Sequence, residues 1–268
     1  MRSRFVIGHG RRIVVAILAL LVSSAASAQG MMDHVDFSSP KMSAADMTRA
    51  EVEALIAQGK PVDLADRSLN GLDLSGLDLT GADLRWARLN RAKLAGTRLD
   101  SARLELAWAI EADLSGASLK GANLFQAQFL RAKLDGADLS GARVAASFEG
   151  ASLVGASFAG ADGEADMRNQ SMGLMRAVFR GAQMRGADLQ AARLGRADLE
   201  YARLGDGNLR DTDLHLALLG GADLRGADLA GCNLTGADLA GAQLQGIAGR
   251  DAIVGLEQAQ NLNRAFLH

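Results

Sequence analysis

Large apolar residues recur at every fifth position over most of the chain. Leucine stands at positions 224, 229, 234, 239 and 244, and an alanine or a cysteine lies two positions before each. A period of five fits neither the 3.6-residue turn of an α-helix nor the two-residue alternation of a strand. It predicts a repeat architecture, in which each short unit buries one large and one small side chain against its neighbours.

The five-residue period falls into two blocks. It is unbroken over 69–144 and again over 174–244, whereas 160–173 has no regular apolar centre. The last centre of the first block and the first centre of the second are thirty positions apart, a multiple of five. We therefore predict one continuous array over 67–246 with an irregular bulge or loop within about 145–173.

The first residues of the chain have the features of an export signal. Residues 1–28 combine a basic start, an apolar run from Ile13 to Val22 and a small-residue motif ending at Ala28. The apolar run is too short to span a bilayer. We predict cleavage after Ala28, a periplasmic or secreted mature protein and no transmembrane segment after cleavage. An uncleaved membrane anchor is the alternative.

The segments between the signal and the array, and after the array, predict a leader and two caps. Residues 29–46 have no period and predict a flexible leader. Within 47–66, Thr48 and Glu51 form a capping-box pattern that predicts a short helix covering the N-terminal end of the array. Within 247–268, we predict a C-terminal cap containing a helix that begins at Asp251.

The repeated unit has a recognisable consensus. Alanine, then aspartate or asparagine, then leucine occur in succession at Ala82-Asp83-Leu84, Ala122-Asn123-Leu124, Ala187-Asp188-Leu189 and Ala237-Asp238-Leu239. In these residues the chain resembles the pentapeptide-repeat family. The resemblance implies an all-β solenoid, a right-handed quadrilateral β-helix of about eight coils, with short terminal capping helices. Four pentapeptides would form each coil, one on each face, with leucine and alanine pointing inward.

Charges twenty positions apart support four units per coil. Such residues would be stacked on neighbouring coils, and opposite charges recur at this spacing. Glu111 lies between Arg91 and Arg131, and other pairs are Asp73 with Lys93, Asp78 with Arg98, Asp83 with Arg103, Arg85 with Glu105, Arg193 with Asp213 and Arg203 with Asp223. Each exposed pair contributes only about 0–1 kcal/mol, so their value is in defining the register.

Composition argues against catalysis. The chain has a formal charge of −2, four histidines and one cysteine. No histidine has a ligand partner at metal-binding spacing, the aspartates follow the repeat, and the glycines follow the corners. We therefore predict no enzyme activity, no cofactor and no metal site. Cys232 occupies a small inward position, which predicts a buried and unreactive thiol.

Methionines are concentrated in and beside the irregular segment, within residues 160–184. Two interpretations remain open. Methionine-rich loops of exported proteins can bind copper(I), or the thioethers fill gaps where regular packing fails. The residues concerned are Met167, Met172, Met175 and Met184.

An apolar cluster at outward positions is the candidate binding surface. The repeat places it where one face turns into the next, with Arg88 positioned to stack on Trp108. Alternatively, these side chains cover one another, or the N-terminal segment covers them. The cluster consists of Trp86, Arg88, Leu106, Trp108, Ile110, Phe125 and Leu130.

These observations favour a non-enzymatic, exported scaffold that presents a rigid surface to a protein or a cell-envelope component. One alternative comes from family members that bind DNA gyrase by imitating duplex DNA and give quinolone resistance. Here, however, arginine and lysine neutralise the aspartates coil by coil, which argues against both DNA mimicry and a nucleic-acid partner. A second alternative is an envelope protein that binds a metal or a glycan. The sequence leaves open a homodimer formed through an end of the rod.

Overall fold

The computed structural model describes residues 39, 43–59, 61–165 and 175–267. Nearly all of them belong to one compact unit, Pro40–His268. The predicted signal peptide and most of the predicted leader lie outside the described residues. Among the described residues, no helix has both the length and the apolar character needed to cross a membrane.

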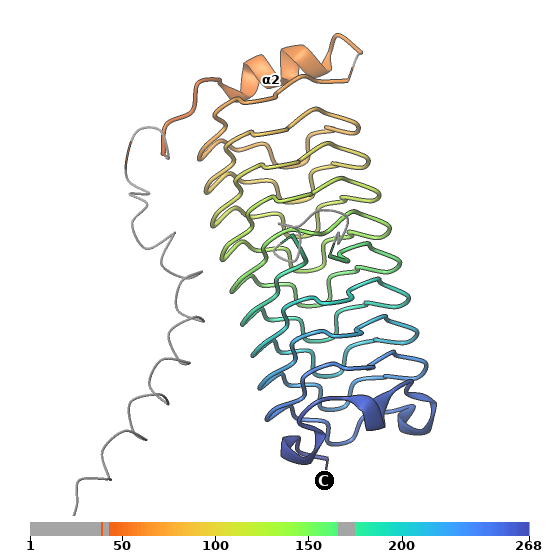
Figure 1. Cartoon of the computed structure of the whole chain (residues 1–268). Coiled ribbons are helices and arrows are strands. Elements are labelled where there is room, and N and C mark those ends of the chain that lie inside the picture. The colour runs from red at the N-terminus through yellow and green to blue at the C-terminus, as the bar shows by residue number, and fades with distance from the viewer. Residues whose placement is uncertain (1–38, 40–42, 60, 166–174, 268) are drawn as a thin grey trace, which may run out of the picture. The chain divides into compact units, whose positions relative to one another are not determined.

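Stacked square coils build this unit (Figure 1). In the regular coils, isolated parallel bridges join one outward residue of each pentapeptide to the residue twenty positions later, for example Asp63 to Asp83 and Asp83 to Arg103. We number the four faces by their first bridged residues: face 1 starts at Asp63, face 2 at Ser68, face 3 at Asp73 and face 4 at Asp78. The twenty-residue register predicted from stacked charges is thus confirmed.

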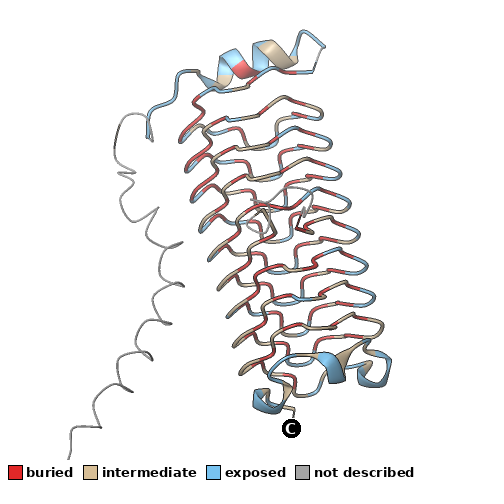
Figure 2. Ribbon diagram, viewed as in Figure 1, coloured by how far each residue is buried: buried red, intermediate tan, exposed pale blue. Residues whose placement is uncertain are grey.

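Buried residues recur on every coil (Figure 2), and most of them are leucine or alanine. Each unit buries its central residue and the residue two before it, as in Leu84 and Ala82, both fully buried. Burying a leucine contributes about 1.5–3 kcal/mol, and each coil contributes up to four such side chains. The inward positions predicted from the period are therefore correct.

Each corner is a tight turn with a left-handed residue. The N–H of Ala87 donates to the carbonyl oxygen of Leu84 at 3.1 Å, and Trp86 between them has φ of 58°. Glycine adopts such backbone without penalty. This is why glycine is common two positions after the central leucine, as at Gly81 with φ of 68°.

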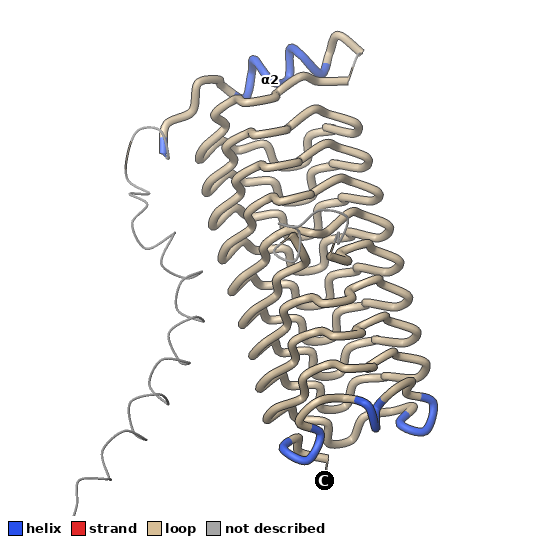
Figure 3. The backbone as a smooth tube through the Cα atoms, in the orientation of Figure 1, coloured by secondary structure: helices blue, strands red, loops and turns tan. Residues whose placement is uncertain are grey.

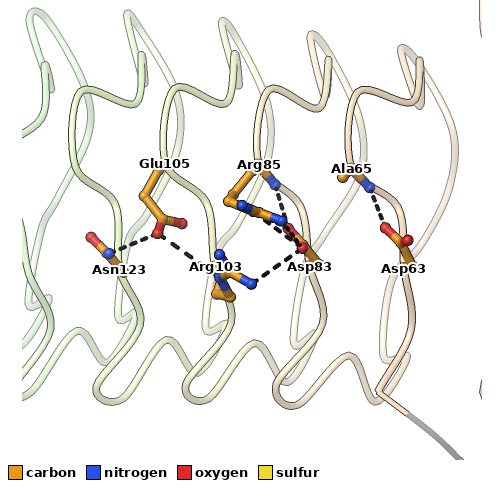
Figure 4. Close-up of polar contacts among 7 residues, drawn as sticks. All are labelled: Asp63, Ala65, Asp83, Arg85, Arg103, Glu105 and Asn123. Atoms are coloured by element: carbon orange, nitrogen blue, oxygen red, sulfur yellow. Dashed lines mark hydrogen bonds and ion pairs between the residues drawn. The ribbon is translucent and has the colours of Figure 1, made fainter.

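The aspartate of the consensus stabilises the same turn (Figure 4). Asp63 accepts a hydrogen bond from the N–H of Ala65 at 3.1 Å, and Asp83 does so from the N–H of Arg85 at 3.2 Å. Asn123 accepts from Phe125 in the same way at 3.1 Å. The aspartates are therefore turn-stabilising groups, which accounts for their periodicity without any catalytic role.

Helix α2, Arg49–Ile56, covers the N-terminal end of the core. Thr48 and Glu51 form the capping box, with the Thr48 N–H donating to Glu51 at 2.7 Å. Val52 is fully buried, and Arg49 donates to the carbonyl oxygen of Asp73 at 2.9 Å. The coils begin at Asp63, slightly before the predicted boundary at residue 67.

The C-terminal end differs from the prediction. In place of one helix from Asp251 there are three 3₁₀ turns, η3 (Arg250–Ala252), η4 (Leu256–Gln258) and η5 (Leu262–Arg264) (Figure 3). Each is followed by a residue that continues the ladder, and these ladder residues are Val254, Gln260 and Phe266. The units have lengthened from five to six residues, so the array extends to the C-terminal end. Bridged positions number ten on each of three faces and nine on the fourth, giving nearly ten coils rather than eight.

One coil is irregular in two places. The spacing first shortens to nineteen residues, from Gln128 to Ser147, and then lengthens to thirty-one, from Ser147 to Val178. The additional chain leaves the ladder at Gly163 and returns at Ala177, whose N–H donates to the Gly163 carbonyl oxygen at 3.1 Å. Much of the predicted loop, 166–174, lies outside the described residues.

The ladder step from Arg143 to Ser147 is one residue short, at the predicted start of the irregular segment, but the additional chain begins a few residues after the apolar pattern is lost at residue 160. Ala161 is fully buried and Asp162 is bridged on both sides, so residues 160–162 form an ordinary unit. Gly163 stands where leucine normally does, which hid the unit. A Cβ at Gly163 would come within 2.8 Å of Ala177 Cβ and 2.9 Å of Leu194 Cδ2, so only glycine fits.

Phenylalanine fills the core around the irregular coil. Phe148 stacks between Phe129 and Phe179, with ring centroids 5.2 and 5.1 Å apart. Phe158 approaches Phe148 and Phe179 edge-on, at 5.8 and 5.4 Å. These rings connect the core of the first block to that of the second.

Candidate functional site

Face 2 differs from the other three in its outward side chains. On faces 1, 3 and 4 the bridged residues are polar or charged until the last coil, where Val254, Phe266 and Ala248 follow. Face 2 carries apolar residues along its length, at Trp108, Val178 and Leu218. These three side chains are half-buried, and they give this face an apolar line.

Bulky residues at strained corners flank the same face. Of the fifteen described non-glycine residues with positive φ, eleven lie at the two corners beside face 2. The four large apolar or aromatic ones, with φ of 58, 61, 59 and 55°, are Trp86, Leu106, Tyr201 and Leu216. Left-handed backbone costs a residue with a side chain roughly 1–2 kcal/mol. Bulky side chains thus replace glycine mainly at the edges of face 2.

The irregular coil brings the two halves of this surface onto one face. Trp108 and Leu218 are 110 positions apart, five and a half coils of twenty residues, so uniform stacking would place them on opposite faces. The irregular spacings, nineteen and thirty-one, total fifty rather than forty residues. The ten extra residues equal half a coil, and they return Leu218 to the face of Trp108.

We define the face-2 surface as the apolar residues of face 2 and its two corners. Several are well exposed: Trp86 by 48%, Tyr201 by 64% and Leu216 by 37%. A hollow of about 290 Å³ beside Leu216 is lined in part by Arg176 and Arg196. The members are Trp86, Leu106, Trp108, Phe125, Leu130, Val178, Tyr201, Leu216 and Leu218.

The structure distributes the sequence-predicted cluster over two corners and face 2. Trp86, Leu106 and Phe125 lie at the corner that enters face 2, and their backbones are hydrogen-bonded coil to coil, as from Leu106 N–H to the Phe125 carbonyl oxygen at 2.9 Å. Trp108 is on the face, and Leu130 is at the corner that leaves it. The cluster is broader than one corner.

Ile110 does not belong to the exposed cluster. It is only 2% exposed, and it follows Asn70 and Asn90, which are each 4% exposed, in the same corner column. Its N–H donates to the Oδ1 of Asn90 at 3.1 Å, and the Asn90 N–H donates to Asn70 in the same way at 2.9 Å. Ile110 is therefore part of an internal column.

The predicted stack of Arg88 on Trp108 is also wrong. The two residues are bridged neighbours, but the Arg88 guanidinium turns to Asp66, at 3.3 Å. Among the described residues, the arginine contacts with rings are Arg85 over Trp86, at 5.3 Å, and Arg143 over Phe125, at 4.1 Å.

Predicted ion pairs between coils are partly confirmed. Arg98 pairs with Asp78 at 3.2 Å, and Glu111 pairs with both Arg91 and Arg131 at 2.9 Å. Others pair locally, because a guanidinium can also reach the carboxylate two positions before it. Thus Arg85 binds Asp83 at 2.6 Å, and the same local pairing joins Arg225 to Asp223.

Candidate reactive groups lie in structural positions. Met184 is fully buried in the core, as expected of a gap-filling side chain, whereas Met167 and Met172 lie outside the described residues. His215 contacts Asp213, with Nδ1 to Oδ1 at 3.1 Å. Cys232 is fully buried, and burial raises the pKa of its thiol to about 12. Within the described segments, no three His, Cys, Asp or Glu side chains could hold a metal ion.

Sequence reasoning missed Val178, Tyr201, Leu216 and Leu218. Two signals point to them. The first signal is a large residue at a corner position where glycine is usual, as at Tyr201 and Leu216. The second is the number of residues in each coil, because this number, together with the five-residue period, decides on which face a residue lies.

Comparison with known protein families agrees with the repeat. The family described as "Pentapeptide repeats" matches residues 62–105, 110–143, 177–215 and 212–247, in eight copies. No curated protein matched.

Among solved structures, the chain is similar to HetL, a pentapeptide repeat protein involved in heterocyst differentiation regulation from the cyanobacterium Nostoc sp. strain PCC 7120. The two are 32% identical over 82% of this chain and 94% of HetL, with a TM-score of 0.31. Full-length QnrB1, a plasmid-mediated fluoroquinolone resistance protein, is 18% identical over 75% of this chain and 93% of its own, with a TM-score of 0.39. A pentapeptide repeat protein from the thylakoid lumen of Arabidopsis thaliana is 29% identical over 47% of this chain and 64% of its own, with a TM-score of 0.22.

Proposed function

Since the chain belongs to the pentapeptide repeat family, we propose that it is a non-enzymatic scaffold whose right-handed quadrilateral β-helix presents the face-2 surface to a protein or cell-envelope partner. The observation that carries this proposal is the placement of large side chains at left-handed corners. Trp86, Leu106, Tyr201 and Leu216 occupy positions where other corners have glycine. Backbone strain maintained beside one face points to a role for that face in binding.

A glycine substitution series tests this proposal. In Trp86→Gly, Tyr201→Gly and Leu216→Gly combined, each corner keeps its backbone while the outward side chain is removed. Glycine relieves left-handed strain, so the variant should stay folded. Binding should weaken, because the apolar contact area is lost. Val154→Ala is the matched control, since Val154 is 46% exposed but lies at the corner between faces 3 and 4.

The assay is photo-crosslinking and affinity capture from a cell-envelope extract. Partners captured by the wild type and by Val154→Ala should be lost from the triple glycine variant, with the far-UV spectrum unchanged. Identical partners for all three proteins would refute a binding role for the face-2 surface.

Export is the second part of the proposal. It is supported by the basic start, apolar run and small-residue motif of residues 1–28. Fractionation with intact-mass analysis of the native protein tests it. A periplasmic or secreted chain that begins at Gln29 is expected, and a full-length cytoplasmic chain would contradict it.

Self-association is the third part. Val254 and Phe266 are 53% and 55% exposed in the last described coil, on faces 1 and 3, so apolar side chains lie on two sides of this end of the rod. Analytical ultracentrifugation should show a dimer that Phe266→Asp converts to a monomer. A wild-type monomer at high concentration would remove this part and leave the face-2 proposal intact.

The structure offers no specific observation in favour of DNA mimicry. Imitating a duplex needs a row of unpaired negative charge, but Asp83, for instance, is bound by both Arg85 and Arg103 (Figure 4). Binding of a metal or a glycan likewise has no described side-chain cluster to support it.

A further inference from the structure

A hollow of about 620 Å³ lies over face 3 and its corner with face 4, and none of the residues that line it belongs to the face-2 surface. Three successive coils line it with arginine, at Arg185, Arg203 and Arg225. We call this hollow the arginine groove.

The groove exists because one side chain is missing from a column. Arg185, Gly205 and Arg225 occupy the same corner position on successive coils. Their backbones are linked, with the Gly186 N–H donating to the Gly205 carbonyl oxygen at 3.0 Å and the Asp206 N–H donating to the Arg225 carbonyl oxygen at 2.9 Å. With about 4.8 Å between coils, the two arginines are anchored about 10 Å apart across the gap above Gly205.

Two of the guanidinium groups are held in place. Arg225 donates from Nε and Nη2 to Asp223, at 2.8 and 2.6 Å. Arg185 donates from the same two nitrogens to Asp206, at 2.9 and 2.7 Å. A guanidinium has five N–H donors, and neither Nη1 takes part in these contacts. Each arginine is therefore oriented and keeps donors for a ligand.

The third arginine, unlike the other two, is not held by a carboxylate of any described residue. Arg203 is exposed, and it forms no ion pair with any residue in the described part of the chain. The two carboxylates of the groove, Asp206 and Asp223, are bound by Arg185 and Arg225. The groove thus has three positive and two negative groups, and its excess positive charge is at Arg203.

We propose that the arginine groove binds a linear oxyanion, a ligand whose carboxylate or phosphate groups span about 10 Å from Arg185 to Arg225 and contact Arg203 between them. A guanidinium fork can donate two parallel hydrogen bonds to a pair of carboxylate or phosphate oxygens. The absent side chain at Gly205 gives the ligand room to lie along the rod.

Binding is measured by isothermal titration calorimetry at low salt, with tripolyphosphate as the phosphate probe and triglutamate as the carboxylate probe. Arg203→Gln removes the excess positive charge of the groove, and Gly205→Leu fills the gap without changing any charge. Gly205 has no left-handed strain, and an added Cβ would be 3.4 Å from the Arg225 carbonyl oxygen, so a side chain can begin at this position without a backbone clash. Arg98→Gln on face 4 is the control, because Arg98 is paired with Asp78 on a face without this groove.

At least one probe should bind the wild type, with an affinity about ten-fold or more lower in Arg203→Gln and in Gly205→Leu and unchanged in Arg98→Gln. Binding of one probe alone would support the site and identify the oxyanion it selects. Equal binding by all variants, or no binding of either probe to the wild type, would overturn the proposal. If Gly205→Leu loses its far-UV spectrum, Arg203→Gln against Arg98→Gln decides the result.

Discussion

Replacing Phe148 by leucine is expected to weaken the contact between the two blocks of coils. Leucine occupies this position in regular coils, so the side chain stays apolar and buried. The substitution removes three ring contacts of Phe148, whose ring centroid lies 5.2, 5.1 and 5.8 Å from those of Phe129, Phe179 and Phe158. At about 0.5–1.5 kcal/mol for each of three aromatic pairs, the free energy of unfolding should fall by about 1.5–4.5 kcal/mol.

Urea unfolding followed by two probes measures both the loss and its location. Trp86 and Trp108, the two tryptophans of the chain, lie in the first block. Tryptophan fluorescence therefore reports on that block, whereas far-UV circular dichroism reports on both. A rod whose coils contact only their neighbours stays cooperative as long as every interface is strong. The two curves should coincide in the wild type and separate in Phe148→Leu.

The control is Leu134→Met, a volume-conserving change at a fully buried position of a regular coil, which should cost less than about 1.5 kcal/mol and leave the curves coincident. A double-mutant cycle with Phe129→Leu should give a coupling of about 0.5–1.5 kcal/mol. Coincident curves in Phe148→Leu together with zero coupling would refute the idea that ring stacking joins the blocks.

Three further predictions concern acid, thiol chemistry and the N-terminal helix. The pKa of Asp83 is lowered because the Arg85 side chain donates to it. The stabilisation from the Asp83 carboxylate is therefore complete above the unfolded pKa of about 3.9 and is lost as the pH falls through the lower folded value. The urea concentration at the unfolding midpoint should fall when the pH is lowered below about 4, and it should fall less in D83N. Burial raises the pKa of Cys232 to about 12, so its thiol should react with a thiol reagent only after unfolding, and rapid labelling of the native protein would contradict this expectation. The contribution of the buried thiol to stability should be lost as the pH rises above the ordinary pKa of a thiol. Thr48→Ala removes the cap bonded to Glu51 and should destabilise α2 by about 1 kcal/mol, measured as faster amide exchange in that helix and not in the coils.

The inward positions and the twenty-residue register could be predicted from the sequence because each depends only on local spacing. Leu84 is buried for the same reason as every other central leucine, and Arg98 lies beside Asp78 because one full coil separates them. Such features repeat many times, so a single irregularity does not obscure them.

The shared face of Trp108 and Leu218 could not be predicted in this way. Ten extra residues leave the five-residue period in step, but they are half of a twenty-residue coil and therefore move every later residue to the opposite face. The C-terminal end was misread for a related reason. Ile253, Leu256 and Ala259 have helical spacing, yet Ile253 and Ala259 are successive inward residues of six-residue units, and η4 makes the turn between them.

The twenty-residue coil constrains how such a rod can change its length. Duplicating or deleting one pentapeptide in a regular stretch preserves the core but rotates every downstream side chain by a quarter turn, which would separate Trp108 from Leu218. Only a whole coil can be gained or lost silently. The segment between Gly163 and Ala177 is the exception, because the ladder closes directly across its ends. Insertions or deletions of any length, or an inserted domain, are therefore best tolerated in this segment.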